Sequence, residues 1–397
     1  MRKEATRETK YWFQHRILTE DKKGAWFAAA NYNGLFYHDF HRKRVSFLGA
    51  FPYGKYANAL YWSGIKVKNK LYFPPRYADR MAVYDISDGI FTAMDIVPGN
   101  RAYQIDFGQN YLGYIPICYG EEVFFLYRCS PFVACMKGAR TSFEYILCGE
   151  TGESLRISAD YIISGDYFFS TIADSNRILI FDMKNHELQV KNVGDSEKRF
   201  FSIALTEGFG ELLLLEEKGV IYTWDFCSDC IHEFLRLPDS ICSVHQPLSF
   251  YEAGGFLYII PFYDWFGNLN RCYKIDLMKK HVEHVDIFRE YDAYIKFMVY
   301  REQDHFGFFI APYGEDIYNS EHVALLDLHI SEGILEKREY IPPGNIENGI
   351  FYDKVSEYQR HISCNRLFRE VSGKNVLSES HSVRLEDFIV YLEDLDS

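Results

Sequence analysis

An apolar run, a polar turn and a second apolar run that ends in aspartate recur along the chain. Clear examples are the runs at 70–73 and 82–85, and those at 167–169 and 179–182. Seven such pairs of runs are present, and six of them end in aspartate: Asp39, Asp85, Asp182, Asp225, Asp276 and Asp327. The third pair ends in Met136 instead. These end positions recur every 43 to 51 residues, and such a period indicates a repeat fold.

The second repeat shows how one unit is built. Strands are expected at 60–67, 70–74, 81–86 and 90–96, with short polar segments between them. Gly89 lies in the last turn, where a positive φ is required. Each repeat is therefore expected to form four antiparallel strands.

Apolar residues are expected on both faces of each sheet, so each sheet needs a neighbour on either side. Helical periodicity is absent, and the unit is too long for a leucine-rich repeat. A closed ring of sheets satisfies both faces and leaves no long exposed edges. The sequence therefore predicts an all-β fold, a seven-bladed β-propeller of four-stranded antiparallel blades. The blades are expected at 11–50, 58–98, 111–149, 155–194, 199–238, 246–288 and 293–341.

The periodic region ends at Pro342-Pro343-Gly344, so we expect a propeller domain at 1–341 and a C-terminal extension at 342–397. Five apolar residues of the extension fall on one face of a short helix predicted at 383–395: Leu385, Phe388, Ile389, Leu392 and Leu395. This helix either caps the propeller or docks a partner.

At the level of the repeat, residues 11–341 resemble the β-propeller superfamily, which includes the WD40 and kelch proteins. Trp224-Asp225 is the only Trp-Asp pair, and Gly254-Gly255 is the only double glycine of the kelch kind. The resemblance implies a central channel and a top face of loops at which ligands and partner proteins bind. It carries no family's functional residues onto this chain.

Three loops predicted between strands two and three are enlarged and rich in aromatic residues, at 74–80, 261–268 and 311–320. The segment 51–58 between blades joins them on the same predicted face. Aromatic rings beside Asp, Asn and Arg suit peptides or sugars, although such rings can also pack between blades. The candidate ligand-binding residues are Tyr53, Tyr56, Arg76, Tyr77, Asp79, Tyr263, Asp264, Trp265, Asn268, Tyr313 and Tyr318.

Other candidate chemistry is weaker. Cys227 and Cys230, with His232 nearby, have the spacing of half a zinc site, but no second pair follows and a turn is expected there. His281 and His284 are interpreted as surface residues of a strand. The recurring aspartates are expected to accept backbone N–H groups in Asx turns, which is a structural role.

The overall composition narrows the class of partner. A net charge of -13 and a pI near 5.5 disfavour nucleic acids and anionic membranes. The N-terminal residues lack the apolar stretch of a secretory signal, and no segment approaches a membrane span. Nine scattered cysteines, such as Cys118 in an apolar run, suggest thiols that serve as core residues. A cytoplasmic location is therefore expected.

The sequence favours a non-catalytic binding or scaffold propeller that recognises a partner protein, a peptide or a carbohydrate through its top face. No catalytic residue, metal ligand or cofactor is expected. The alternative is a propeller hydrolase or lyase that uses loop carboxylates as acid and base; the candidates are Asp79, Asp264, Glu315 and Asp316. A third hypothesis places the contact on the C-terminal helix. Departures from the repeat, including the blade with Met136, are where we expect information about function.

Overall fold

The computed structural model describes a large part of the chain. The described residues are 15–21, 23–29, 34–39, 41–42, 44–49, 51, 61, 63–76, 78, 80–96, 113–128, 132–138, 142–147, 155–206, 211–237, 248–253, 255–261, 272–285, 294–302, 305–312, 324–329 and 334–338. The predicted C-terminal extension and its helix lie outside this part. The predicted boundary after residue 341 also lies outside it and stays a prediction.

The described residues form seven four-stranded antiparallel sheets, each made of four strands that are consecutive in the chain. We call them sheets 1 to 7 in chain order. Sheet 1 contains β1 (His15–Asp21), β2 (Gly24–Ala29), β3 (Leu35–Asp39) and β4 (Arg44–Gly49). Sheet 2 contains β5 (Ile65–Val67), β6 (Lys70–Phe73), β7 (Met81–Asp85) and β8 (Ile90–Met94). Sheet 3 contains β9 (Tyr114–Tyr119), β10 (Glu122–Tyr127), β11 (Phe132–Lys137) and β12 (Glu144–Leu147).

The other four sheets repeat this order. Sheet 4 contains β13 (Ile157–Ser164), β14 (Tyr167–Ile172), β15 (Arg177–Asp182) and β16 (Glu187–Asn192). Sheet 5 contains β17 (Phe200–Leu205), β18 (Leu212–Glu216), β19 (Val220–Asp225) and β20 (Cys230–Arg236). Sheet 6 contains β21 (Leu248–Ala253), β22 (Phe256–Pro261), β23 (Cys272–Asp276) and β24 (His281–Val285). Sheet 7 contains β25 (Tyr294–Glu302), β26 (His305–Pro312), β27 (Ala324–His329) and β28 (Ile334–Arg338).

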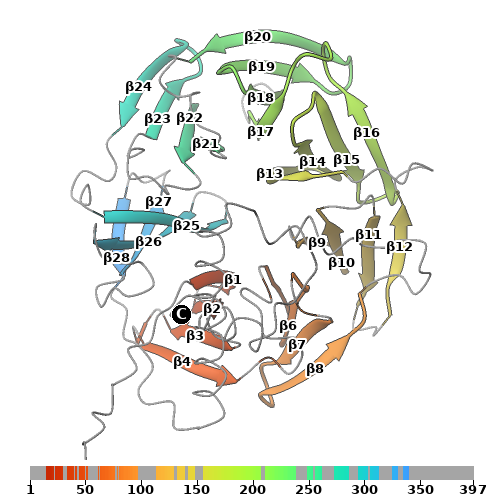
Figure 1. The fold of residues 1–397 in the computed structure, drawn as a ribbon, viewed down its shortest axis with the longest axis vertical. Coiled ribbons are helices and arrows are strands. Elements are labelled where there is room, and N and C mark those ends of the chain that lie inside the picture. Colours follow the sequence, from red (N-terminus) through yellow and green to blue (C-terminus); the bar gives the residue numbers. More distant parts are fainter. Residues whose placement is uncertain are drawn as a thin grey trace, which may run out of the picture.

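The sheets are arranged in a ring, with the first strand of each sheet toward the centre and the fourth at the outside (Figure 1). The ring closes where β1 of sheet 1 lies beside β25 of sheet 7, and β1 also contacts β5 of sheet 2. Within the described ranges, no sheet mixes strands from the two ends of the chain. The expected fold of four-stranded antiparallel sheets, each complete in sequence, is therefore confirmed.

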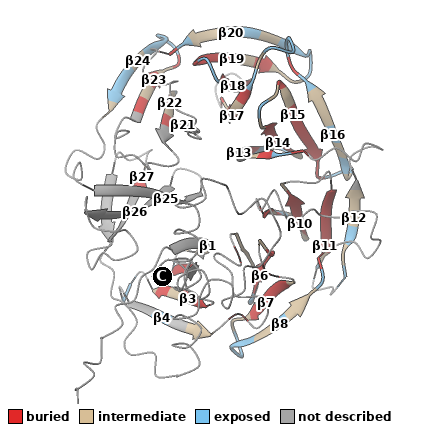
Figure 2. Ribbon diagram, in the orientation of Figure 1, coloured by how far each residue is buried: buried red, intermediate tan, exposed pale blue. Residues whose placement is uncertain are grey.

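The core lies between neighbouring sheets, because the middle strands whose burial is described are buried on both faces (Figure 2). Phe124 of sheet 3 meets Phe181 of sheet 4 edge to face, with ring centroids 5.0 Å apart. Phe169 of sheet 4 contacts the fully buried Trp224 of sheet 5 in the same manner. The outermost strands β16, β20 and β24 instead alternate between partly buried and exposed residues. Apolar side chains on both faces are thus satisfied by flanking sheets, as the sequence predicts.

The predicted Asx turns are present in five sheets. The Asp182 Oδ1 atom accepts the N–H groups of Lys184 and Asn185, at 3.0 and 2.9 Å. Equivalent bonds reach the carboxylates of the other four turns, which belong to Asp39, Asp85, Asp225 and Asp276. The fourth residue after the aspartate has a positive φ in the turns that end at Gly89, His186, Asp229 and Lys280. Local turn chemistry therefore joins strand three to strand four.

Two sheets depart from this pattern and correct the sequence alignment. In sheet 3 the residue equivalent to the aspartate is Lys137, because it pairs with Glu122 at the start of β10 and the next residue, Gly138, donates its N–H to the Glu121 carbonyl. Met136 is one position earlier and fully buried. In sheet 7, Asp327 lies inside β27, which continues to His329, so the expected Asx turn at the end of the strand does not begin there.

Two smaller expectations are also wrong. The first strand of sheet 2 covers only Ile65–Val67, and an isolated bridge pairs Tyr61 with Pro75 at the other end of the expected strand. Cys118 is exposed rather than part of the core; it follows Ile117, whose side chain packs in the layer between sheets 3 and 4, so its own side chain lies on the opposite face of β9. Cys135 on β11 is buried, as expected for a thiol that serves as a core residue.

Candidate functional site

The meander order gives the ring two distinct faces. On one face, strand two leads into strand three and strand four leads into the next sheet; we call it the loop face. On the opposite face, the turn face, strand one leads into strand two and strand three into strand four. The segments that contain the predicted ligand-binding residues connect β4 to β5, β6 to β7, β22 to β23 and β26 to β27.

Arg76 is the one predicted ligand-binding residue inside the described part of the chain. It follows β6 and is partly buried. A Cβ atom added to Gly113 would lie 3.8 Å from the Arg76 Cβ, so the side-chain stem lies against the segment that enters sheet 3. The other predicted residues lie outside the described residues: Tyr53, Tyr56, Tyr77, Asp79, Tyr263, Asp264, Trp265, Asn268, Tyr313 and Tyr318, as do Glu315 and Asp316.

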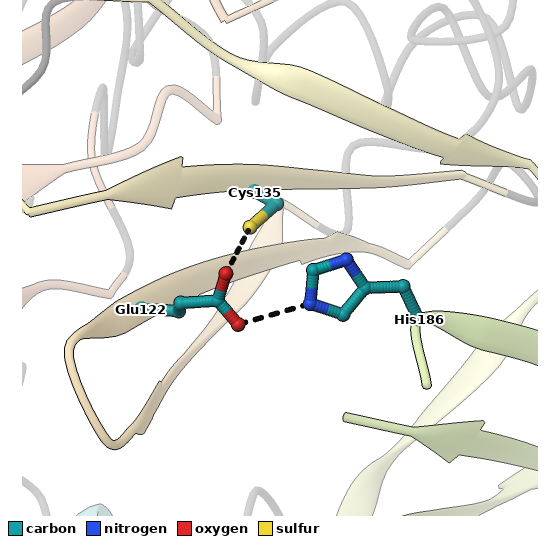
Figure 3. A group of neighbouring side chains, drawn as sticks. All are labelled: Glu122, Cys135 and His186. Carbon is teal, nitrogen blue, oxygen red and sulfur yellow. Dashed lines mark hydrogen bonds and ion pairs between the residues drawn. The ribbon is translucent and has the colours of Figure 1, made fainter. Parts of the chain in front are cut away.

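A group of three polar side chains lies on the turn face, between sheets 3 and 4 (Figure 3). The Glu122 Oε2 atom is 2.9 Å from Nε2 of His186, and the Cys135 Sγ atom lies 3.9 Å from Glu122 Oε1. The thiol, imidazole and carboxylate atoms all lie within 4.8 Å of one another. Three groups that can bind a ligand therefore converge on one point.

Three separate backbone elements hold this group. Glu122 is the first residue of β10, and Cys135 lies on β11 with its side chain in the apolar layer between sheets 3 and 4. His186 ends the Asx turn that Asp182 begins, and has a φ of 60°. Its ring meets Phe124 edge to face, with centroids 5.5 Å apart. Strand register and a tight turn thus orient the three side chains before any ligand binds.

The surroundings of the group are partly open and contain further charges. The side chain of Glu122 is 23% exposed to solvent, and that of His186 is 25% exposed. Lys137 reaches both Glu122, at 3.6 Å, and Glu144, at 3.2 Å. Burial and the charge of Glu122 raise the pKa of the Cys135 thiol to about 12. In the absence of a ligand this thiol is protonated at neutral pH, so it is a poor nucleophile.

The order of the three groups also disfavours cysteine hydrolase chemistry. In such sites an imidazole lies between the thiol and an acidic group, so that it can take the thiol proton. Here the Glu122 carboxylate lies between the Cys135 thiol and the His186 imidazole. The donor set of sulfur, nitrogen and oxygen is instead one that binds transition metals.

The residues that sequence reasoning weighed as metal ligands are placed differently. Cys227 and Cys230 are exposed in and after the turn between β19 and β20, and the Cys227 N–H donates to Asp225 Oδ1 at 2.8 Å. The turn role is therefore confirmed. His281 and His284 are exposed on β24, as expected. Among the residues that the structure describes, Glu122, Cys135 and His186 form the one group of three His, Cys, Asp or Glu side chains whose ligand atoms converge.

Sequence reasoning missed this group because its members are far apart in the chain. Glu122 and His186 are separated by 64 residues and meet only where two sheets pack. One signal was available: the repeat with Met136 lacks the turn aspartate, and the group forms in that sheet. A second signal is His186 itself, which occupies a turn position where the second repeat has Gly89.

No family model matches the chain, and no curated protein matches its sequence. Similar solved structures include one described as YCF48 bound to D1 peptide, with 11% identity, a TM-score of 0.52, and coverage of 81% of this chain and 95% of that chain. The structure of Citrobacter koseri AztD is 10% identical, with a TM-score of 0.43, and covers 83% of this chain and 87% of its own. Within the described ranges, no helix is long and apolar enough to cross a membrane. The likeness to YCF48 and the ring of antiparallel sheets identify a fold of the β-propeller type.

Proposed function

We propose that the protein is a seven-bladed, non-catalytic β-propeller that binds a partner protein or peptide at its loop face. The observation that carries the proposal is the placement of four strand connections. All four leave the same face of the ring; they join β4 to β5, β6 to β7, β22 to β23, and β26 to β27. They belong to sheets 6, 7, 1 and 2, which follow one another around the ring, since β25 lies beside β1. The binding surface would therefore be continuous.

The composition of these connections fits a polypeptide ligand. Tyrosine and tryptophan offer large rings that bury area at a low cost in conformational entropy, and Asp, Asn and Arg can pair with backbone groups. In its solved structure YCF48 is bound to a D1 peptide, so a fold of this kind accommodates a peptide. The net charge of -13 favours a partner segment with basic residues, because complementary charge speeds association.

The test compares an affinity-tagged wild-type chain with a loop-face variant, Tyr77→Ala/Tyr263→Ala/Trp265→Ala, in capture from a native lysate followed by mass spectrometry. The matched control is Ile90→Ala/Met278→Ala, which removes two exposed apolar side chains from the turn face. Truncating aromatic anchors typically costs about 2 kcal/mol or more of binding free energy each. We expect a partner that is held by the wild type and by the control and is lost from the loop-face variant, while all three chains melt at similar temperatures.

Two further variants separate the proposed function from the other hypotheses. A chain with Asp79→Asn, Asp264→Asn, Glu315→Gln and Asp316→Asn should still capture the partner, because the amides keep hydrogen-bonding groups and the lost charge mainly slows association. A ligand that this variant retains and the wild type does not would instead indicate turnover by these carboxylates. Deletion of 383–397 should also leave binding intact. Loss of the partner only on deletion would assign the contact to the C-terminal segment. Retention of every partner by the loop-face variant would refute the proposal.

A further inference from the structure

We propose that Glu122, Cys135 and His186 form a binding site for one divalent transition-metal ion such as Zn²⁺, on the turn face between sheets 3 and 4. The site is separate from the loop face. The site supplies one sulfur, one nitrogen and one oxygen ligand. A tetrahedral ion would therefore have a fourth coordination position open to water or to another molecule. Glu122 and Cys135 come from sheet 3 and His186 from sheet 4, so the ion would bridge two sheets.

The distances lie close to those that a single tetrahedral ion requires. Zinc binds sulfur at about 2.3 Å and nitrogen or oxygen at about 2.0–2.2 Å, which places two ligand atoms about 3.3–3.8 Å apart. The pair between Glu122 and His186 is 2.9 Å apart, the pair between Glu122 and Cys135 is 3.9 Å apart, and no pair exceeds 4.8 Å. Side-chain shifts of about 1 Å would bring all three atoms into the range that one tetrahedral ion requires.

The group is also organised in advance. Cys135 is held in a packed strand with 1% of its surface exposed, and the His186 ring is held against the buried Phe124. Because Glu122 and His186 remain partly exposed, an ion can enter from the turn face. Thiolate and imidazole ligands select Zn²⁺ and similar ions over Mg²⁺ and Ca²⁺, which prefer oxygen alone.

Lys137 sets the strength of the site. Its ammonium lies 3.6 Å from Glu122 Oε1 and 3.2 Å from Glu144, so it supplies the positive charge that faces the Glu122 carboxylate. A bound cation would replace Lys137 as the partner of Glu122, and Lys137 would keep its contact with Glu144. Lys137 therefore competes with the metal, and its removal is expected to increase metal affinity. An apolar or purely structural role for the group makes no such prediction.

The experiment titrates the purified, metal-free full-length chain with Co²⁺ and follows the thiolate-to-cobalt charge-transfer absorption, then displaces Co²⁺ with Zn²⁺. We expect one ion per chain. Cys135→Ser should abolish the charge-transfer band, and Glu122→Gln and His186→Asn should each weaken binding at least tenfold. Asn is chosen because it tolerates the positive φ at position 186. Lys137→Met should tighten binding by about fivefold, which corresponds to loss of a competing ion pair of about 1 kcal/mol.

The matched control is Cys227→Ser/Cys230→Ser, which removes two exposed thiols of sheet 5 and should change neither the band nor the stoichiometry. Binding that survives Cys135→Ser and disappears in the control variant would assign the metal to the exposed thiols and overturn the proposal. Absence of a charge-transfer band in the wild type would overturn it as well. If Cys135→Ser does not fold, the Lys137→Met variant still tests the proposal. Metal binding that is unchanged or weaker in that variant would contradict the proposed site.

Discussion

Lys137 pairs directly with Glu122 across the β10–β11 ladder, at the register position where four other sheets place the turn aspartate. An opposite-charge pair thus replaces the Asx turn in sheet 3. The replacement also affects the contact with sheet 4, because the Glu122 carboxylate that pairs with Lys137 faces His186 of that sheet. Sheet 3, which lacks the turn aspartate, thus gains an ionisable group at its boundary with sheet 4.

Restoring the repeat at this position should destabilise the protein. Lys137→Asp would remove ion pairs to Glu122 and Glu144 and set a third carboxylate beside them. Like charges directly opposite in a ladder are unfavourable, so we expect a loss of roughly 1 kcal/mol in the free energy of unfolding. Denaturant titration measures it. Adding Glu122→Gln should recover part of the loss, and equal effects with and without that change would contradict the explanation.

The Asx turn of sheet 4 should contribute measurably to stability. Asp182 accepts two backbone N–H groups and the Asn185 side-chain amide, at 2.9–3.0 Å. Since a hydrogen bond contributes about 0.5–1.5 kcal/mol, Asp182→Ala should lower the free energy of unfolding by about 1–3 kcal/mol. Asp182→Asn should lose less, because its oxygen still accepts. Gln189→Ala, an exposed and uncharged change in the adjacent strand opposite Ile180, is the control and should be nearly neutral.

The turn aspartates should also make stability fall in acid. The pKa of Asp39 is lowered by the Arg42 N–H, that of Asp225 by the Ser228 hydroxyl, and that of Asp276 by the Lys279 N–H. A carboxyl whose pKa is lower in the folded state stabilises that state above the unfolded pKa of about 3.9, and the contribution is lost as pH falls through the folded pKa.

The measurement is the melting temperature between neutral pH and about pH 2, a range that spans the unfolded carboxyl pKa values. A chain with Asp39→Asn, Asp225→Asn and Asp276→Asn should lose less stability below about pH 4 than the wild type, because amides do not titrate. Parallel curves for the two chains would show that these carboxylates do not contribute.

Two buried threonines should respond oppositely to the same substitution. Thr171 on β14 is fully buried, and its hydroxyl has no hydrogen-bond partner within the described part of the chain. Thr206 is also buried, but its hydroxyl donates to the Glu211 carbonyl at 2.9 Å. Replacing an unpaired buried hydroxyl by methyl should stabilise the protein by about 1 kcal/mol, whereas loss of a bond costs about 0.5–1.5 kcal/mol. Thr171→Val and Thr206→Val are compared by denaturant titration; a loss of stability in both would reveal a partner for Thr171.

The periodic pattern by itself determined the architecture of the repeat. The strands, the Asx turns at residues such as Asp182 and Asp276, and the need for sheets on both sides follow from short-range chemistry. Turn residues act on neighbours two or three positions away, and alternation of apolar residues reports the burial of each strand. These signals are local, so one sequence contains them.

Two features became known only from the tertiary structure: the strand register of sheet 3, and the contact between Glu122 and His186. Shifting an apolar run by one residue exchanges its two faces, and the choice between Met136 and Lys137 depends on which strand lies opposite. The contact across 64 residues depends on how two finished sheets pack, since each side chain alone is an ordinary residue of a turn or a strand end. Sequence therefore specified the blades, and packing between them specified the polar group that we propose binds metal.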